Sequence, residues 1–265
     1  MAGRIRRRAF LRGVRGGSPY GLRLWICHYN GNAGGSAVIV RKQGDRFVLF
    51  RQHDHALVSA DFALKLKEIG HPSAVYAIAM HDVGWRLLDR EVLWNEEEDR
   101  PYSFMDYPLG PKLPAYKAGI DRVAAEDAYA GCLCSMHYAS FFEGVSDPAA
   151  VRFREEELER QERLKAGMKS EERDGLNRDL RLLKFCDHLS LFVCLNEPGQ
   201  NRFPWFREGL DYFGRRLLPV WESPRQLRFS PNPFREPFTV TIPYRVVNAA
   251  REPEEEGQLS IDVVC

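Results

Sequence analysis

The dipeptide His81-Asp82 is the most conspicuous candidate for a chemically active site in this sequence. It ends an apolar run, residues 74–80, whose composition is typical of a helix packed in a protein core. An imidazole and a carboxylate in such surroundings must be hydrogen-bonded, paired or bound to a cation, because burying a lone charge is costly. His and Asp are also residue types that ligate divalent metal ions. The pair therefore predicts one part of a metal centre.

Three more potential ligands stand at apolar helical positions elsewhere in the chain. Asp187 shares a predicted helical face with Leu183 and Leu191, so its carboxylate lies in the middle of an apolar stripe. His137 is likewise surrounded by apolar residues at helical spacing, and His55 aligns with the apolar positions of its own predicted helix. Each of these side chains needs a polar partner in the core.

Each residue taken alone also has an ordinary structural interpretation. Asp187 can pair with Lys184 or Arg181, and a single buried His such as His137 is commonly a hydrogen-bonded core residue. In the crowded stretch 53–55, Asp54 suits a helix cap, so His55 is the expected ligand. Four separate helices that each place an imidazole or carboxylate on an inner face favour a shared cation, since every one otherwise carries its own desolvation cost.

The donor set suits a divalent ion but does not select one. Nitrogen and oxygen donors bind Mn, Fe, Zn, Ni and, through the carboxylates, Mg. The predicted ligands are His55, His81, Asp82, Asp187 and His137. The cofactor is therefore expected to be a divalent metal ion of unspecified identity.

The order of these residues resembles that of the HD-domain metal-dependent phosphohydrolases, whose His, His-Asp and Asp ligands correspond to His55, His81, Asp82 and Asp187. The chain is more closely similar to the largely bacterial domain-of-unknown-function family 3891 over roughly residues 38–244. The motifs that carry this similarity are Gln52-His53-Asp54-His55-Ala56, His81-Asp82-Val83-Gly84-Trp85, Ser135-Met136-His137 and Asp187-His188-Leu189-Ser190-Leu191-Phe192-Val193-Cys194. The resemblance implies an HD-type helical bundle in which His137 is an additional ligand or faces a phosphate. The family has no assigned reaction.

These residues lead to the hypothesis of a divalent-metal-dependent phosphohydrolase of HD type that acts on a small phosphorylated molecule. The metal lowers the pKa of a bound water and polarises a phosphoryl oxygen. Asp82 is a candidate base, and His137 or Lys184 is a candidate for stabilising negative charge on a phosphate. Trp85 and Arg86, one turn beyond the pair, are candidates for shaping the substrate pocket, although a Trp at such a position commonly packs in the core.

Two other functions remain open at this point. An HD-like scaffold with extra histidines can hold two irons and activate oxygen, and His53, His137 and His188 leave room for such a cluster. The polar cluster can also serve a non-catalytic module that binds a small ligand or has a structural role. The iron content of the purified protein distinguishes the di-iron oxygenase from the hydrolase. The absence of stoichiometric metal would favour the non-catalytic module.

The elements that must position these residues are mostly helical. Apolar periodicity predicts helices over 54–66, 73–85, 116–142, 152–169 and 177–195, and the Pro-rich and acid-rich stretch 95–114 predicts a long irregular connection. A hairpin is expected over 37–50, and alternation predicts strands over 227–229, 238–247 and 259–264. The predicted fold class is mainly α: an HD-type helical bundle with a small β appendage made of the N-terminal hairpin and the C-terminal strands.

Composition and charge suggest where the domain begins. Residues 1–44 contain nine Lys or Arg and no acid, so the remaining 29 basic and 37 acidic residues give the rest of the chain a net charge of −8. We expect residues 1–35 to be a basic, Gly-rich and Arg-rich disordered tail. Residues 36–265 should form one HD-like domain, with a helical core at about 52–220 and a β-rich segment at about 226–265.

The remaining expectations concern partners and compartment. The chain has no apolar run long enough to cross a bilayer, so a membrane partner is not expected. A nucleic-acid partner is not expected either, because only the Arg-rich opening suggests one. Six Cys without a C-x-x-C pair, four of them in apolar helical runs, favour reduced thiols and a cytoplasmic protein. The oligomeric state is not predicted.

Overall fold

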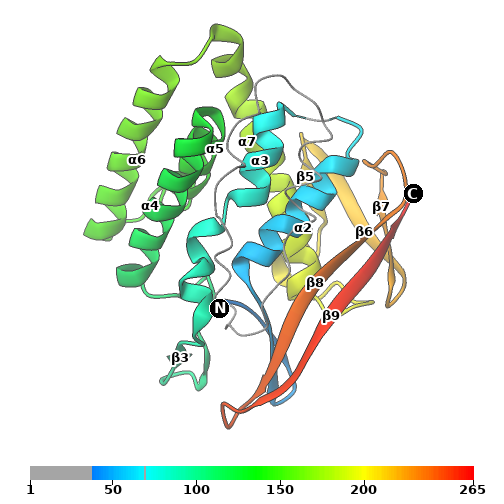
Figure 1. Ribbon diagram of the computed structural model, residues 1–265. Helices are drawn as coiled ribbons and strands as arrows, with labels where there is room; N and C mark the ends of the chain where they lie inside the picture. The colour runs from blue at the N-terminus through cyan, green and yellow to red at the C-terminus, as the bar shows by residue number, and fades with distance from the viewer. Residues whose placement is uncertain (1–37, 69) are drawn as a thin grey trace, which may run out of the picture. The chain divides into compact units, whose positions relative to one another are not determined.

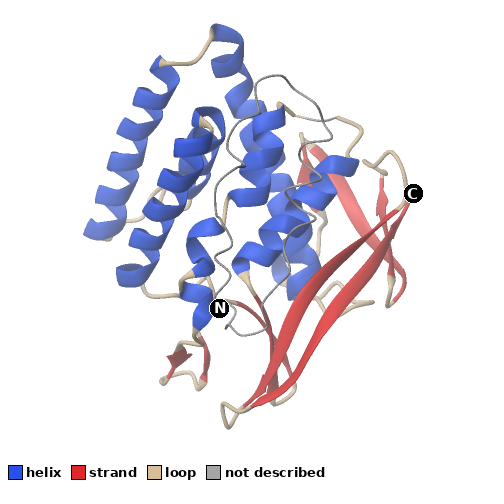
Figure 2. Cartoon of the chain, in the orientation of Figure 1, coloured by secondary structure: helices blue, strands red, loops and turns tan. Residues whose placement is uncertain are grey.

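The computed structural model describes residues 38–68 and 70–265, and in this part of the chain a group of helices packs against a curled, seven-stranded sheet (Figure 1; Figure 2). The basic tail predicted for residues 1–35 lies outside the described residues. None of the helices described is both long and apolar enough to cross a membrane.

In residues 38–68 and 70–265, six α-helices and three short 3-10 helices make up the helical part. The α-helices are α2 (Gln52–Lys65), α3 (Pro72–Met80), α4 (Leu109–Glu126), α5 (Ala128–Ser140), α6 (Pro148–Ala166) and α7 (Ser170–Leu195), and the 3-10 helices are η1 (Val83–Arg86), η2 (Leu88–Arg90) and η3 (Pro204–Phe206). The predicted helix over 116–142 is two helices, because Asp127 adopts an extended backbone and caps α5 through the Ala130 amide. The chain over 95–114 is less irregular than expected, since α4 begins within it at Leu109.

The sheet is built from both ends of the described chain. Its seven strands are β1 (Ile39–Gln43), β2 (Arg46–Phe50), β5 (Leu210–Tyr212), β6 (Arg215–Ser223), β7 (Gln226–Ser230), β8 (Phe238–Asn248) and β9 (Pro253–Val264). They follow the spatial order β1-β2-β8-β9-β7-β6-β5, and every neighbouring pair is antiparallel except β7 and β9. A separate two-stranded ladder joins β3 (Trp94–Asn95) and β4 (Arg100–Pro101).

The prediction of a mainly α bundle with a small β appendage is wrong. Of the described residues, 48% are helical and 25% lie in strands, and the seven strands form a curled half-barrel rather than an appendage. The sequence conceals these strands for physical reasons. β6 contains Pro219, which argues against a strand, and β9 begins with the exposed, acid-rich stretch 253–256. Tertiary pairing overrides these local signals.

The sheet and the helices meet along α2 and the end of α7. Phe62 of α2 lies against Phe234 and Phe238, with ring centroids 5.9 and 5.6 Å apart. At the other contact, the Arg41 guanidinium of β1 donates hydrogen bonds to the carbonyls of Cys194 and Asn196, where α7 ends. These contacts satisfy carbonyls that the end of a helix leaves unpaired. The sheet thus fixes two of the helices that carry the candidate site.

Two glycines allow the segment after Asp82 to lie directly on α4. A Cβ added to Gly84 would come within 2.1 Å of the Ala115 carbonyl oxygen, and one added to Gly119 would come within 2.8 Å of the Gly84 amide nitrogen. Such approaches are impossible for a larger residue without backbone movement. The two glycines therefore set the position of η1, which directly follows the His81-Asp82 pair.

Candidate metal centre

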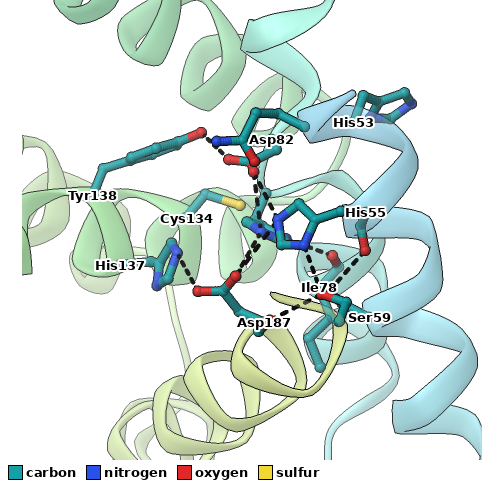
Figure 3. A network of polar contacts seen from close by, with 12 residues as sticks. His53, His55, Ser59, Ile78, Asp82, Cys134, His137, Tyr138 and Asp187 are labelled. Carbon is teal, nitrogen blue, oxygen red and sulfur yellow. Dashed lines mark hydrogen bonds and ion pairs between the residues drawn. The ribbon is translucent and has the colours of Figure 1, made fainter. Parts of the chain in front are cut away.

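Four helical elements bring five predicted residues together in the interior of the helical part. His55 comes from α2, His81 and Asp82 from the end of α3, His137 from α5 and Asp187 from α7. All five are buried, with Asp187 the most exposed at 7%. Figure 3 shows His55, Asp82, His137 and Asp187 converging from different helices. Their role as ligands stays a prediction.

The polar atoms of this cluster lie at short range from one another. His55 Nε2 is 3.0 Å from Asp82 Oδ2 and 3.5 Å from Asp187 Oδ1. His81 Nε2 is 3.5 Å from the same oxygen of Asp82 and 3.8 Å from the same oxygen of Asp187. His137 Nε2 approaches the other oxygen of Asp187 at 3.7 Å. Three imidazoles therefore surround two carboxylates without charged arginine or lysine in these contacts.

His81 is held in the orientation that a metal-ligating histidine requires. Its Nδ1 lies 2.8 Å from the Ile78 carbonyl oxygen, which can only accept, so Nδ1 carries the proton. In the neutral ring, Nε2 then has a free lone pair. This buried nitrogen has no hydrogen-bond partner among the described residues and faces the carboxylate oxygens of Asp82 and Asp187. A lone pair beside two carboxylates is a repulsive arrangement, which either a bound cation or a proton on Nε2 relieves.

Serine side chains orient His55 from behind. Its Nδ1 lies 2.6 Å from Ser190 Oγ, and the Ser190 hydroxyl is placed to donate to the Asp187 carbonyl at 2.9 Å. His55 Nε2 lies 3.0 Å from Asp82 Oδ2 and donates a hydrogen bond to that carboxylate when the ring is protonated there. When Ser190 instead accepts the Nδ1 proton, Nε2 is the nitrogen left to bind a cation. Ser59 completes the chain at 2.7 Å from Ser190 Oγ. Hydrogen bonds of this kind fix the tautomer of a ligating histidine.

Asp82 is held as a carboxylate with one oxygen directed at the histidines. The Tyr138 hydroxyl donates to Oδ1 at 2.6 Å (Figure 3). This leaves Oδ2 beside His55 and His81. Burial raises the pKa of the Asp82 carboxyl, but positive charge on the His81 and His55 rings, when they are protonated, and the hydrogen bonds from His55 and Tyr138 outweigh it, so the pKa lies well below its usual range. Asp82 is thus anionic, as a ligand must be.

His137 stays neutral in its pocket of rings. Burial lowers its pKa to about 3, an effect that the nearby Asp187 only partly opposes. The ring packs edge-on against Phe141, with centroids 4.6 Å apart, and edge-on against His81 at 5.3 Å. A neutral imidazole is suited to bind a cation and unsuited to carry positive charge toward a phosphate.

The residues present fit a divalent cation. One ligand atom from each of His55, His81 and Asp82 lies within 4.8 Å of the others, and the same holds for His81, His137 and Asp187. Ligand atoms that share an ion at about 2.0–2.2 Å lie roughly 3–4 Å from one another, which matches the separations of His55, His81 and the two carboxylates. The donors are nitrogen and oxygen atoms, so the set does not choose among Mn, Fe, Zn, Ni and Mg.

Cysteine does not complete this set. Cys134 lies near the cluster in Figure 3, but its thiol is placed to donate to the Ala77 carbonyl at 3.8 Å. Burial raises the pKa of Cys134 far above its usual range, which keeps the thiol protonated. The other three cysteines predicted as core thiols, Cys132, Cys186 and Cys194, are also buried and free.

A large pocket reaches the cluster at Asp187. Its volume is about 820 Å³, which is within the range of roughly 300–1,000 Å³ typical of small-molecule sites. Apolar and aromatic side chains dominate its walls, and Lys112 is the one lysine or arginine among the lining residues. Burial lowers the pKa of Lys112 to about 8, an effect that Asp106 only partly opposes. The pocket is lined by Phe104, Met105, Asp106, Tyr107, Pro108, Leu109, Lys112, Tyr116, Phe141, Phe142, Val145, Asp187, His188, Leu191 and Trp205.

Comparison with known protein families identifies one match over most of the chain. The profile of a family described as "Protein of unknown function (DUF3891)" matches residues 38–249. The chain belongs to DUF3891. No curated protein and no solved structure matches it. The matched region includes every residue of the cluster and of the pocket, whereas β9 begins beyond its end.

Apart from His137, the residues predicted to contact the substrate or to stabilise its charge lie outside the cluster of this DUF3891 chain. Trp85 is 1% exposed and contacts the rings of Tyr107 and Tyr116, so it supports the pocket wall from behind. Arg86 is exposed, and Lys184 is half-buried one turn before Asp187. Membership of the family does not test these roles.

The other histidines considered from the sequence are also separate from the cluster. His53 is buried near the start of α2 but lies apart from the converging side chains in Figure 3. Burial lowers its pKa to about 4. His188 is exposed and lines the pocket beside Asp187.

Sequence reasoning missed three residues that shape this DUF3891 site. Two of them were detectable in principle: Tyr138 directly follows His137, and Ser190 lies one helical turn after Asp187. Lys112 gave no usable signal, since it stands between prolines in a stretch predicted to be irregular.

Proposed function

We propose that this DUF3891 protein is a divalent-metal-dependent hydrolase of phosphoesters, with an HD-type arrangement of ligands. The observation that carries the proposal is the buried Nε2 of His81, which lacks a hydrogen-bond partner among the described residues and faces two carboxylates. An arrangement that leaves such atoms unsatisfied is costly for a fold and is characteristic of functional sites. The proposed substrate is a small phosphorylated molecule, and the proposed compartment is the cytoplasm.

In this proposal, His55, His81, Asp82 and Asp187 bind the ion, with His137 as a further ligand. A divalent ion held there supplies Lewis acidity and a water of lowered pKa. Ser190 and the Ile78 carbonyl orient His55 and His81, and Tyr138 orients Asp82. The protein's part is thus to hold nitrogen and oxygen lone pairs in a dry interior around one point.

Asp82, Asp187 and Lys112 have different proposed roles. Asp82 accepts a hydrogen bond from Tyr138 and contacts two histidines, so we propose it as a ligand rather than as a freely acting base. Asp187 is the ligand at the pocket floor, where a substrate must arrive. Lys112, in the wall of the same pocket, is better placed than Lys184 to hold an anionic group.

Metal content of matched variants tests the proposal. We expect purified wild-type protein to contain about one divalent ion per chain, measured by elemental analysis after addition of Mn or Ni. Asp187→Asn and His81→Gln should lose metal affinity by more than the 10–100-fold typical of altered supporting residues. His188→Gln, the exposed neighbour of Asp187, is the control and should keep the metal. Unchanged metal content in both ligand variants would contradict the assignment.

Activity is then measured on the metal-loaded proteins. Wild-type protein should release p-nitrophenol from p-nitrophenyl phosphate or from bis(p-nitrophenyl) phosphate, and Asp187→Asn should not. A metal-loaded wild type that hydrolyses neither compound counts against a phosphohydrolase. A wild type that never binds metal, and whose melting temperature is unchanged by a chelator, favours a non-catalytic ligand-binding module instead.

One observation favours a second candidate, a di-iron oxygenase. The triad His81, His137 and Asp187 adjoins the triad His55, His81 and Asp82, so the cluster offers more donors than one tetrahedral ion needs. His81 is shared, however, and its Nδ1 is engaged by Ile78, so only one nitrogen serves both triads. Two irons per chain, with visible absorbance and oxygen consumption, would establish this alternative over hydrolysis.

A further inference from the structure

The pocket above Asp187 is unusually apolar for a site that is to receive a phosphate. Four of the eight large hydrophobic side chains that are exposed in the described part of the chain line this one pocket. They are Met105 at 47%, Phe141 at 48%, Val145 at 39% and Trp205 at 51% exposed. Exposed apolar side chains that gather at one concave site mark a binding surface rather than scattered surface variation.

The walls between this apolar group and Asp187 are aromatic. Phe104 contacts Trp205 edge-on, with centroids 6.2 Å apart, and Tyr116 stacks on Tyr138 at 3.9 Å. Through this stack, the pocket wall touches the residue that orients Asp82. A molecule in the pocket thus meets aromatic rings along its body and the polar cluster at one end.

Lys112 is the exception in this apolar environment. Lys112 is only 8% exposed, and its Nζ donates one hydrogen bond, of 2.7 Å, to the Phe104 carbonyl. Asp106, the nearest acid by sequence among the lining residues, is paired with Arg100 at 2.8 Å. Within the described residues, Lys112 has no ion-pair partner within 4.0 Å, so its ammonium has donors left for an anion. A buried charge without a partner is costly unless a ligand supplies the opposite charge.

We propose that the substrate is an amphiphilic phosphoester, whose phosphate lies between Asp187 and Lys112 and whose alkyl or aryl group fills the aromatic pocket. This inference rests on the proposed function, since it assigns the substrate class of the same site. The pocket offers few polar groups to read a sugar or a nucleobase, so a polar ester of the same size leaves its hydroxyls unpaired there. We assign the substrate to a free molecule rather than to a lipid headgroup in a membrane, because the pocket is a site of small-molecule volume.

The test uses a homologous series of n-alkyl phosphonates, which keep the anionic head and cannot be hydrolysed as esters. Binding of butyl, hexyl and octyl phosphonate to the full-length, metal-loaded protein is measured by calorimetry. Each added methylene should strengthen binding about twofold to fourfold, because a fully buried CH₂ contributes roughly 0.8 kcal/mol. Equal dissociation constants for butyl and octyl phosphonate, or no binding of any member of the series, would overturn the inference.

Variants separate the head from the tail of the ligand. Trp205→Ser and Phe141→Ser, both at exposed positions, should flatten the dependence on chain length, while Leu87→Ser is the control at an exposed apolar position that does not line the pocket. Lys112→Met should weaken every member of the series by the same factor, about tenfold, and leave the chain-length dependence intact. If each added methylene strengthens binding equally in the wild type and in both pocket variants, the alkyl or aryl group does not occupy this apolar pocket.

Two further measurements keep this inference distinct from the proposed function and from its rivals. A steep chain-length dependence without any phosphoester hydrolysis would reject the hydrolase and retain the amphiphile pocket. Hydrolysis with equal kcat/KM for glycerol phosphate and octyl phosphate would retain the hydrolase and reject the pocket assignment. We expect no co-sedimentation with phosphatidylcholine vesicles containing phosphatidic acid, and strong co-sedimentation would overturn the assignment to a free molecule.

Discussion

Two buried carboxylates on α7, eight residues apart, face opposite ends of α3 in very different ways. Asp179 lies where α3 begins and accepts hydrogen bonds from the Tyr129 hydroxyl at 2.8 Å, from the His71 amide at 3.2 Å and from the Arg178 guanidinium at 2.9 Å. Asp187 lies where α3 ends and is surrounded by imidazole nitrogens at 3.5–3.8 Å. The first carboxylate has hydrogen-bond donors, and the second has histidine rings.

The difference shows how a structural acid is told from a functional one. Burial alone does not distinguish them, since Asp179 is 0% and Asp187 is 7% exposed. The partners do: a carboxylate with an amide, a hydroxyl and a guanidinium is fully satisfied, whereas one beside an imidazole held as an acceptor still lacks a positive charge. The hydrogen bonds of Asp179 therefore suffice for a structural role, whereas the arrangement at Asp187 favours a bound cation.

The largest expected effect comes from neutralising each acid in turn. Asp179→Asn should lower the free energy of unfolding by about 3 kcal/mol, because it disrupts a buried network of donors. Asp187→Asn should change it by less than about 1 kcal/mol in a metal-free buffer, since it relieves repulsion there. Urea denaturation of both variants in the presence of a chelator makes the measurement. Equal destabilisation by the two substitutions would remove the distinction between the clusters.

Metal removal should affect the two variants differently as well. An ion present at 100 times its dissociation constant stabilises the folded state by about 2.7 kcal/mol. A chelator should therefore lower the melting temperature of the wild type by several degrees and leave that of Asp187→Asn unchanged. In Asp179→Asn, the chelator should still produce the wild-type shift, because the two clusters do not share a residue. A melting temperature insensitive to the chelator in both the wild type and Asp179→Asn would contradict this expectation.

The sequence predicted the cluster better than the fold, and the reason is physical. A polar side chain in an apolar helical stripe is visible one helix at a time, and the desolvation argument then requires a partner for each. The proximity of His55, His81, Asp82, His137 and Asp187 followed from that argument alone. The seven-stranded sheet could not be predicted in this way, because β9 is half exposed and polar. Its place between β8 and β7 depends on pairing across distant segments.

The pocket lay beyond sequence reasoning for a related reason. Met105, the nearby pair Phe141 and Val145, and Trp205 come from three separate segments, and each resembles an ordinary surface apolar residue when read alone. Only the fold shows that they line the same pocket as Asp187. Lys112 was missed because Pro111 and Pro114 flank it, and the helix α4 tolerates both within its first two turns.

The contact between η1 and α4 offers an intermediate effect. Gly119→Ala should lower the free energy of unfolding by about 1–3 kcal/mol, because the new methyl group would approach the Gly84 backbone to within 2.8 Å. It should also weaken metal binding, since Gly84 directly follows the segment that holds Asp82. Gly110→Ala in the same helix is the control: a Cβ there meets nothing within 4 Å. Chemical denaturation and metal titration of the two variants decide whether the close approach positions Asp82.

The smallest effect concerns a third acid, Asp61 of α2, which has neither the donors of Asp179 nor the histidines of Asp187 within the part of the chain that the structure describes. Burial raises its pKa to about 6, and Lys65, one turn along the helix, lowers it only partly. Its protonated form is therefore favoured by folding, so its contribution is most favourable below the unfolded pKa of 3.8 and is lost as the pH rises through about 6. Asp61→Asn should match the wild type at pH 4 and exceed its unfolding free energy by about 1 kcal/mol at pH 8, after allowance for partial exposure. Urea denaturation at the two pH values measures this, and a difference independent of pH would show that burial of Asp61 carries no such cost.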